Sequence, residues 1–373
     1  MKLKINRNIL LEKLNNVGRA LSNRNIIPII NGILFTLNDE GLELFATDNE
    51  ITIKASIARD EIKEITETGT AVLPGRFILD ILRKLNSEDI TIEEIDGGKV
   101  MLSTNTSRYN LNCFNASEFP NIRIELNTNP IKLTAGNFKE IVNQTVFATS
   151  TQESKPLLTG INLKILGNSL ECVATDSYRL AKKSVKISGL SEDSVNIVIP
   201  ARNINEFIKL IENDDDVIEM HAFSNKVLFK YKEYLFQSSL LNGTYPNTDT
   251  LVPTSFETIY KLNVNEFYNI MDRASILAQV KDKNIVSLET TGTKLKLTSS
   301  SAEIGKIEEE MNVEVIKGSD IKISFSVKYM MEALRSFTGK EINIYFNGEI
   351  KPIILKEGDN GDLIQLILPI KTY

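Results

Sequence analysis

The chain has 373 residues, of which 42% are hydrophobic and 25% are charged, and its formal net charge is −6 at pH 7. This composition is typical of a globular protein of two or three domains and argues against a surface that is coated with nucleic acid everywhere. The uncharged apolar stretch at 26–37 is broken by Pro28 and Gly32, and the N-terminus lacks the apolar run of a secretory signal, so we expect a cytoplasmic protein with no membrane partner.

The same order of elements is predicted three times along the chain. Each copy opens with an amphipathic helix, continues with alternating strands at 41–48, 169–176 and 294–300, and then has a strand that leads into a second helix at 71–85, 197–211 and 323–337. The apolar stripes of the opening helices are Leu10, Leu14, Val17 and Leu21; Phe138, Val142, Thr145 and Ala148; and Phe267, Met271, Ala274 and Leu277. We predict three similar α+β domains at 1–127, 128–254 and 255–373, each with two helices packed on antiparallel sheets.

The second helices carry the same charges at positions 126 residues apart. A cation, an anion and a second cation share one face of each helix, and the apolar side chains lie on the opposite face. The equivalent sets are Arg76, Arg202 and Lys328; Asp80, Glu206 and Glu332; and Arg83, Lys209 and Arg335. In one helix this pattern would be an ordinary solvated face with weak ion pairs. Three copies in register favour a shared surface for a polyanion with a regular backbone.

Stacking of nucleic-acid bases is not indicated, because the chain has no tryptophan, no cluster of aromatic residues and no basic tail. Contacts with phosphates, diluted by carboxylates, are more typical of a protein that slides along duplex DNA than of one that reads its sequence.

The sequence offers little for catalysis. The only histidine, His221, stands in an alternating strand pattern, where we expect it to face solvent. No Cys/His spacing suits zinc and no phosphate-binding glycine loop appears, while Asp214, Asp215 and Asp216 form a predicted turn. Cys113 and Cys172 are interpreted as small buried side chains without a disulfide. We therefore predict a protein that is not an enzyme and that has no metal and no cofactor.

Several motifs resemble the β sliding clamp of bacterial DNA polymerase III, and the resemblance covers the whole chain. The most specific is residues 173–181, Val-Ala-Thr-Asp-Ser-Tyr-Arg-Leu-Ala, with Asn-Gly-Thr-Tyr-Pro at 242–246 and Ile-Leu-Pro-Ile at 367–370 in the order of that family. The resemblance implies a DNA clamp fold in which two chains pair head to tail into a ring around duplex DNA. It also implies a processivity factor that tethers the replicative polymerase, with an ATP-dependent clamp loader and other proteins carrying clamp-binding peptides as partners.

By this resemblance, three sets of residues have roles. The peptide-binding pocket would consist of Leu158, Thr175, Tyr178, Arg179, Leu180, Pro246, Leu251, Ser326, Tyr329, Ile350, Pro352, Leu366, Leu368, Pro369 and Ile370. The residues facing DNA would be Arg24, Arg76, Arg83, Gln152, Arg202, Lys209, Lys328 and Arg335. The dimer interface would include Lys99, Arg108, Tyr109, Leu111, Ile276, Leu277 and Glu303.

Two alternatives remain open at this stage. One is a three-domain protein-binding scaffold, as a ring without DNA or as a monomer, which the mass of the native particle would distinguish. The other is a hydrolase built around His221, which a His221→Ala variant would test.

Overall fold

The structure is a computed structural model that describes residues 1–21, 27–95, 98–122, 124–126, 129–278, 284–301, 303–358 and 361–371, without the side chains of 188–193. Arg24 and the predicted boundary at 127 lie outside the described residues. The chain divides into two compact units, Met1–Ala135 with Asn203–Leu240 and Gly136–Arg202 with Leu241–Tyr373. The three domain ranges predicted from the sequence are not tested by this division and remain a prediction. Within the described ranges, no helix is both long enough and apolar enough to cross a membrane.

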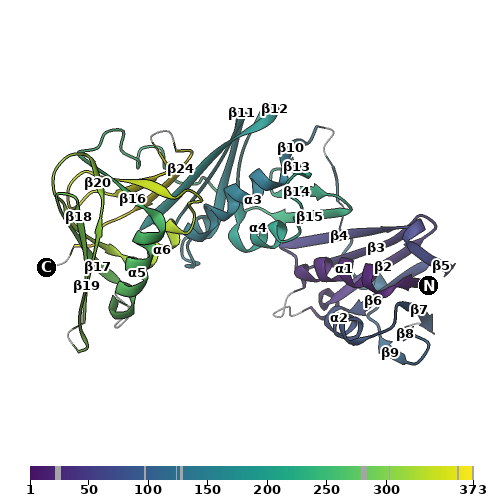
Figure 1. Ribbon diagram of the computed structural model, residues 1–373. Coiled ribbons are helices and arrows are strands. Elements are labelled where there is room, and N and C mark those ends of the chain that lie inside the picture. Colours follow the sequence, from purple (N-terminus) through teal and green to yellow (C-terminus); the bar gives the residue numbers. More distant parts are fainter. Residues whose placement is uncertain are drawn as a thin grey trace. The chain divides into compact units, whose positions relative to one another are not determined.

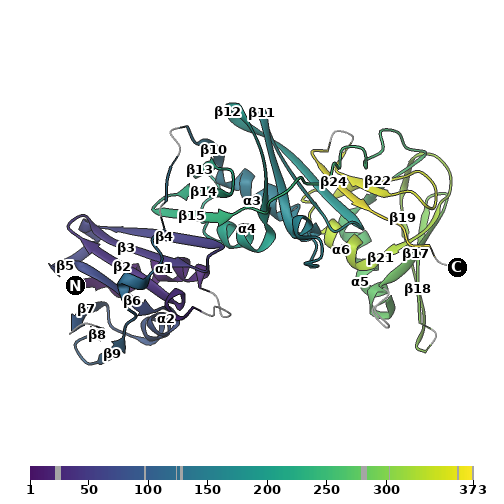
Figure 2. The same cartoon turned by 180° about the vertical axis from the view of Figure 1, so that it is seen from behind.

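The first unit contains two antiparallel sheets (Figures 1 and 2). One has the order β5-β1-β7-β8-β9, with strands Ile62–Glu67, Lys2–Asn6, Asp89–Ile95, Lys99–Ser103 and Arg108–Asn112. The other has the order β10-β13-β14-β15-β4-β3-β2-β6, with strands Ile131–Thr134, Val217–Ala222, Lys226–Tyr231, Tyr234–Ser239, Ile51–Ala58, Gly41–Thr47, Gly32–Asn38 and Gly69–Pro74. Helix α1, Arg7–Val17, packs on β3 and β4 beside α2, Gly75–Lys84.

The second unit also contains two antiparallel sheets. One has the order β11-β12-β24-β23-β22-β16-β20, with strands Gly160–Thr175, Arg179–Pro200, Leu363–Ile367, Ile353–Lys356, Glu341–Phe346, Thr258–Asn263 and Glu314–Lys317. The other has the order β19-β18-β17-β21, with strands Gly305–Asn312, Lys294–Ser301, Ile285–Thr291 and Lys322–Ser326. Helices α5, Val264–Ala278, and α6, Val327–Leu334, pack on each other, and their apolar faces share one buried core with both sheets.

The helix positions confirm the repeat predicted from the sequence. The three second helices, α2, α4 (Ala201–Ile208) and α6, begin at residues 75, 201 and 327, which are 126 residues apart in both steps. Their predicted apolar faces are inside: Ile78 and Leu82, Ile204 and Phe207, and Met330 and Leu334 are buried. The opening helices are α1, α3 (Ala135–Asn143) and α5. Short 3-10 helices follow two of them, at Gly18–Ala20 (η1) after α1 and at Val146–Ala148 (η5) after α3, and η6 (Pro156–Thr159) precedes β11.

A Thr-Asp turn recurs at the end of the alternating strand in the first two repeats. The Asp48 carboxylate accepts hydrogen bonds from the backbone N–H groups of residues 50 and 51, and the Asp176 carboxylate accepts them from residues 178 and 179. Each preceding threonine accepts from the N–H two residues later and donates to the carbonyl four residues later. Asn49 and Ser177 have positive φ values of 75° and 81°. Identical local bonding therefore explains why Thr-Asp appears in both copies.

Each of these turns leads into a strand that pairs with a strand of the following repeat. We call the pairing of β4 with β15 the first seam and the pairing of β12 with β24 the second seam. In the first seam Lys54 lies opposite Leu235, and in the second seam Lys182 lies opposite Ile364. Lys54 and Lys182 each stand six residues after the turn aspartate, so the two seams have the same register.

The prediction for His221 is wrong. Its side chain is only 2% exposed on β13, because the neighbouring strand β14 has three consecutive buried residues, Val227, Leu228 and Phe229, which shows that both faces of the sheet are covered there. The cysteine prediction is confirmed for Cys172, which is fully buried, while Cys113 is half-buried; both are free thiols. The aspartates at 214–216 lie in the predicted turn, where Asp216 accepts a hydrogen bond from Tyr231.

Candidate functional site

A pocket of about 120 Å³ in the second unit brings together most of the residues predicted to bind peptides. Segments far apart in the sequence form it: the turn that joins β11 to β12, the C-terminal strand β24 with the residue that follows it, and two single residues, Leu251 and Pro352. Its lining residues are Thr175, Ser177, Tyr178, Arg179, Leu180, Leu251, Pro352, Leu366 and Leu368. The pocket thus lies at the second seam, where Leu180 and Leu366 are directly paired across the strands.

The pocket has a buried floor and an exposed apolar rim. Leu180 and Leu366 are 1% and 4% exposed, whereas Tyr178, Leu251 and Leu368 are 59%, 48% and 37% exposed. Large apolar side chains that gather around one concavity with this exposure are typical of a docking site for apolar groups.

The turn at the pocket is held rigidly. Besides the bonds of Thr175 and Asp176 described above, the Thr175 N–H donates to the Tyr245 hydroxyl at 3.1 Å, and the Leu368 N–H donates to the Tyr178 carbonyl at 2.9 Å. Burial raises the pKa of Tyr245, so this phenol stays protonated at neutral pH. A preorganised wall of this kind reduces the entropy cost of binding a ligand.

Arg179 is the one cation in the pocket lining, and its side chain is only 9% exposed. Its Nε donates to Asp176 at 3.0 Å, one terminal nitrogen donates to the Phe147 carbonyl at 2.7 Å, and the other is paired with Glu332 on α6. Its Cζ lies 4.4 Å from the ring centre of Tyr329. Sequence analysis predicted Arg179 at the pocket but missed its bond to Glu332, for which nothing in the local pattern gives a signal.

The remaining predicted pocket residues lie around the pocket but outside its lining. Leu158 is buried in the cluster beneath Leu180 and Leu366. Ser326 caps α6 by accepting from the Tyr329 N–H at 3.4 Å. Pro246 and Ile350 are exposed, and Pro369 and Ile370 are half-buried beyond Leu368. Ser177 also lines the pocket, next to Tyr178.

The equivalent position at the first seam has the same backbone and different chemistry. The residues that occupy the places of Tyr178, Leu180, Leu366 and Leu368 are Glu50, Thr52, Gln237 and Ser239, as the shared turn and seam register show. Polar and charged side chains there offer no apolar cavity. The repeat therefore supplies the scaffold twice within the chain, and the apolar lining is present at the second seam.

The predicted DNA-facing residues on the second helices are exposed in both units. Arg76, Arg202, Lys209, Lys328 and Arg335 are all exposed, as are Arg83 and Gln152. In each helix one apolar face packs inward and the two cations are exposed, while Phe77 on α2 is an apolar side chain that is 68% exposed. The structure thus presents the predicted cations to solvent on each helix.

The predicted dimer residues divide into exposed and buried ones. Arg108 and Lys99 are exposed on the edge strand β9 and its neighbour β8, and Tyr109 and Leu111 are half-buried. Ile276 is 65% exposed on α5 and Glu303 is exposed. Leu277 is only 7% exposed, because it follows the inner stripe of α5 set by Phe267, Met271 and Ala274. Its side chain therefore belongs to the core of its own unit.

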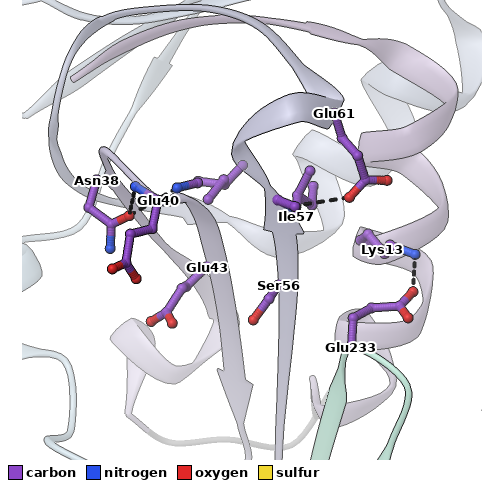
Figure 3. A pocket seen from close by; sticks show the side chains of 11 residues that line it. Lys13, Asn38, Glu40, Glu43, Ser56, Ile57, Glu61 and Glu233 are labelled. Carbon is purple, nitrogen blue, oxygen red and sulfur yellow. Dashed lines mark hydrogen bonds and ion pairs between the residues drawn. The ribbon is translucent and has the colours of Figure 1, made fainter.

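A larger pocket of about 410 Å³ in the first unit has a different character (Figure 3). Carboxylates of Glu40, Glu43, Glu61 and Glu233 surround it, and Lys13 from α1 is paired with Glu233. Glu61 accepts from the Ala58 N–H at 3.1 Å and caps the turn after β4. Its polar groups thus join α1 to the β14–β15 turn. Among the described residues, no group of three or more His, Cys, Asp or Glu side chains is arranged to hold a metal ion.

Comparison with known proteins identifies the family. Models of the N-terminal, central and C-terminal domains of the DNA polymerase III beta subunit match residues 1–123, 132–247 and 249–371. The beta sliding clamps of Staphylococcus epidermidis and Staphylococcus aureus are 37% and 36% identical, over the full length of both chains in each case.

Solved structures agree with these matches. The sliding clamp of Bacillus subtilis has a TM-score of 0.97 at 35% identity, and the DNA polymerase III beta chain of Streptococcus pneumoniae has 0.96 at 31%, each with complete coverage of both chains. A Pseudomonas aeruginosa clamp bound to griselimycin shares the fold at 23% identity, with a TM-score of 0.94. The chain therefore belongs to the DNA polymerase III beta subunit family, the bacterial sliding clamps.

Proposed function

We propose that two copies of the chain close head to tail into a ring around duplex DNA and tether the replicative polymerase through the pocket at the second seam. As a sliding clamp the chain is a processivity factor and not an enzyme. Its working place is the cytoplasm, where an ATP-dependent clamp loader would open the ring and place it on DNA. The observation that carries the proposal is the exposed apolar rim of the pocket, formed by Tyr178, Leu251 and Leu368.

The pocket suits an extended peptide with apolar anchor residues. Each large aliphatic side chain that is fully buried contributes about 1.5–3 kcal/mol, less the cost of ordering the peptide. Two anchors on the Leu180 and Leu366 floor therefore contribute about 3–6 kcal/mol, and contacts of the rest of the peptide would supply the remainder of the about −8 kcal/mol that micromolar affinity requires.

A matched pair of variants tests the pocket. Leu368→Asp would place a carboxylate against an apolar floor without a partner, and calorimetry with a synthetic peptide that ends in two large aliphatic residues should show no binding. Ser239→Asp, at the equivalent position of the first seam, should bind the peptide like the unmodified protein. Equal binding by both variants would contradict the placement of the peptide site.

Head-to-tail closure is supported by the edges that the sheets leave unpaired. The first repeat ends in the edge strand β9 and the third repeat has the edge strand β19. Strand β9 is the counterpart of β15 and β24 in the other two repeats, and β19 is the counterpart of β4 and β12. The repeat thus forms two seams within the chain, and β9 of one chain with β19 of its partner would form a third seam of the same kind. Different surfaces meet in such an interface, so it is heterologous and its rotation must close.

The register of this third seam follows from the strand ladders. The backbone N–H groups of residues 7, 135 and 264 donate equivalent hydrogen bonds to the carbonyls of residues 88, 216 and 340, which follow the second helix of each repeat. Lys4, Lys132 and Lys261 each stand three residues before these donors and are therefore equivalent. In each repeat the lysine is paired with a residue on the neighbouring strand, and that residue is paired in turn with one on the next strand, up to the last strand of the repeat. The residues reached on the last strands β9, β15 and β24 are Arg108, Leu235 and Ile364.

The partners of Leu235 and Ile364 are Lys54 and Lys182. In the third repeat Lys306 is the counterpart of Thr52, because Lys306 pairs with Ser300 as Thr52 pairs with Thr47. Glu308 stands two residues after Lys306 and is therefore the counterpart of Lys54 and Lys182. The third seam therefore places Arg108 opposite Glu308, a favourable pair of opposite charges.

The helices supply the contact with DNA in this proposal. Exposed cations recur on α2, α4 and α6 and would face the phosphates of the enclosed duplex without reading its bases. Sequence-independent contacts of this kind weaken with salt and permit sliding.

A further inference from the structure

The three equivalent carboxylates of the second helices have different partners. Asp80 on α2 pairs with Arg83 of its own helix at 3.4 Å. Glu206 on α4 pairs with Lys209 at 2.6 Å and with Arg19 at 3.5 Å. In both helices the anion therefore neutralises the second cation of the same face. Glu332 on α6 instead pairs with Arg179, which lies 153 positions earlier in the chain and lines the peptide pocket.

Arg179 is fixed in place by its other contacts. Asp176 and the Phe147 carbonyl hold two of its nitrogens, and the ring of Tyr329 lies against its guanidinium. A guanidinium that is restrained on three sides and almost fully buried directs its remaining N–H groups to one position. Glu332 is therefore held toward the pocket.

The consequence appears on the exposed face of α6. One cavity of about 210 Å³ is lined by Glu332, by Lys328 four residues before it and by Arg335 three residues after it. At these spacings on a helix, the Glu332 carboxylate is a neighbour of both cations. In the described part of the chain, no carboxylate is paired with Lys328 or Arg335, and the Arg335 Nε donates to the Tyr268 hydroxyl at 3.0 Å. This helix thus presents two cations that its own anion does not neutralise.

We propose that Arg179 is a positioning residue for DNA contact: by holding Glu332 it keeps Lys328 and Arg335 available for phosphates and links the peptide pocket to the DNA-facing helix. This inference rests on the proposed function, in which these helices face DNA. It makes α6 the strongest of the three second helices in phosphate contact. A ligand that draws Arg179 away from Glu332 would weaken that contact, and DNA would weaken the binding of such a ligand to the same extent.

The test compares carboxylate removal in the three helices. The affinity of the dimeric protein for a short fluorescein-labelled duplex is measured by anisotropy between 50 and 200 mM salt. Asp80→Asn and Glu206→Gln should each free one cation per chain and steepen the slope of log affinity against log salt by about 0.9 per chain, or about 1.8 for the dimer, which makes the loss of affinity over this range about twelve-fold larger. Glu332→Gln should leave the slope unchanged, because Arg179 already holds that carboxylate.

Arg179→Met should have the opposite effect. The released Glu332 would neutralise Lys328 or Arg335 and lower the slope by about 0.9 per chain, or about 1.8 for the dimer, and the double variant Arg179→Met with Glu332→Gln should restore the original slope. A double variant as weak as Arg179→Met alone would overturn the proposal. So would a Glu332→Gln slope that steepens as much as that of Glu206→Gln, and this comparison stands even if Arg179→Met does not fold. A wild-type protein without salt-dependent DNA binding would instead contradict the proposed function.

Discussion

Cys172 is a buried residue of β11, and its sulfur lies 3.1 Å from the hydroxyl of Thr145 in the segment that follows α3. Burial raises the pKa of this thiol to about 12, and burial likewise raises the pKa of the half-buried Cys113 to about 11. Because the thiolate is the reactive form of cysteine, both side chains are expected to be inert at neutral pH.

Alkylation measures this directly. With iodoacetamide at pH 8, the folded protein should incorporate little label over a time in which the urea-unfolded protein is labelled at both cysteines, as intact mass would show. Since both pKa values are raised above the ordinary 9.0, the stability they contribute is complete below pH 9 and is lost as the pH rises toward 11–12. Rapid labelling of Cys172 in the folded state would contradict its burial.

Single residues were also where sequence analysis was least reliable. The pairing of Arg179 with Glu332 joins residues 153 positions apart, and no local pattern encodes it. His221 was misplaced because an alternating pattern gives the direction of a side chain and not what covers it. Of the residues that the family resemblance assigned to the peptide pocket, eight line one cavity, and their role in binding stays a prediction.

At the level of elements, the repeat was predictable because the helix starts and the apolar stripes recur three times along the chain at equal spacing. The seams were not, because strand pairing between repeats depends on register, which composition does not specify. The seam register gives a prediction that distinguishes one alignment of β9 and β19 from its neighbours. In this register Arg108 is opposite Glu308, and Asn110 is opposite Lys306.

Two substitutions to the same residue should therefore have opposite effects. Arg108→Glu would place like charges opposite each other and weaken the dimer, while Asn110→Glu would place a carboxylate opposite Lys306 and strengthen it. Cross-strand pairs contribute about 0.2–1 kcal/mol each, and a ring of two chains contains this seam twice, so sedimentation equilibrium should detect changes in the dissociation constant of up to about 30-fold in each direction. If the register were shifted by two residues, residue 110 would lie opposite Glu308, and Asn110→Glu would weaken the dimer instead of strengthening it.

At the level of the whole molecule, the net charge of −6 is compatible with DNA binding because two exposed cations recur on the same face of each second helix. Enclosure and affinity predict different behaviour on DNA. A ring loaded on circular duplex by a clamp loader should remain on it through gel filtration at a salt concentration that abolishes binding to a short linear duplex.

Linearising the loaded circle with a restriction enzyme should release the protein, because sliding off the ends requires no opening of the ring. Retention on the linear product would indicate tight direct binding instead of enclosure. A native mass of one chain would favour the alternative of a monomeric scaffold.

The equivalence of the seams has a consequence for where the ring opens. Two seams are closed by strands of one chain, so covalent connection keeps their partners at a high effective concentration and a broken pairing reforms at once. The proposed seam between β9 and β19 would have the same strand geometry but would be maintained by mass action between separate molecules. The three pairings would thus differ in permanence because two of them join strands of one chain and the third joins two molecules, so the proposed ring would open at the third seam.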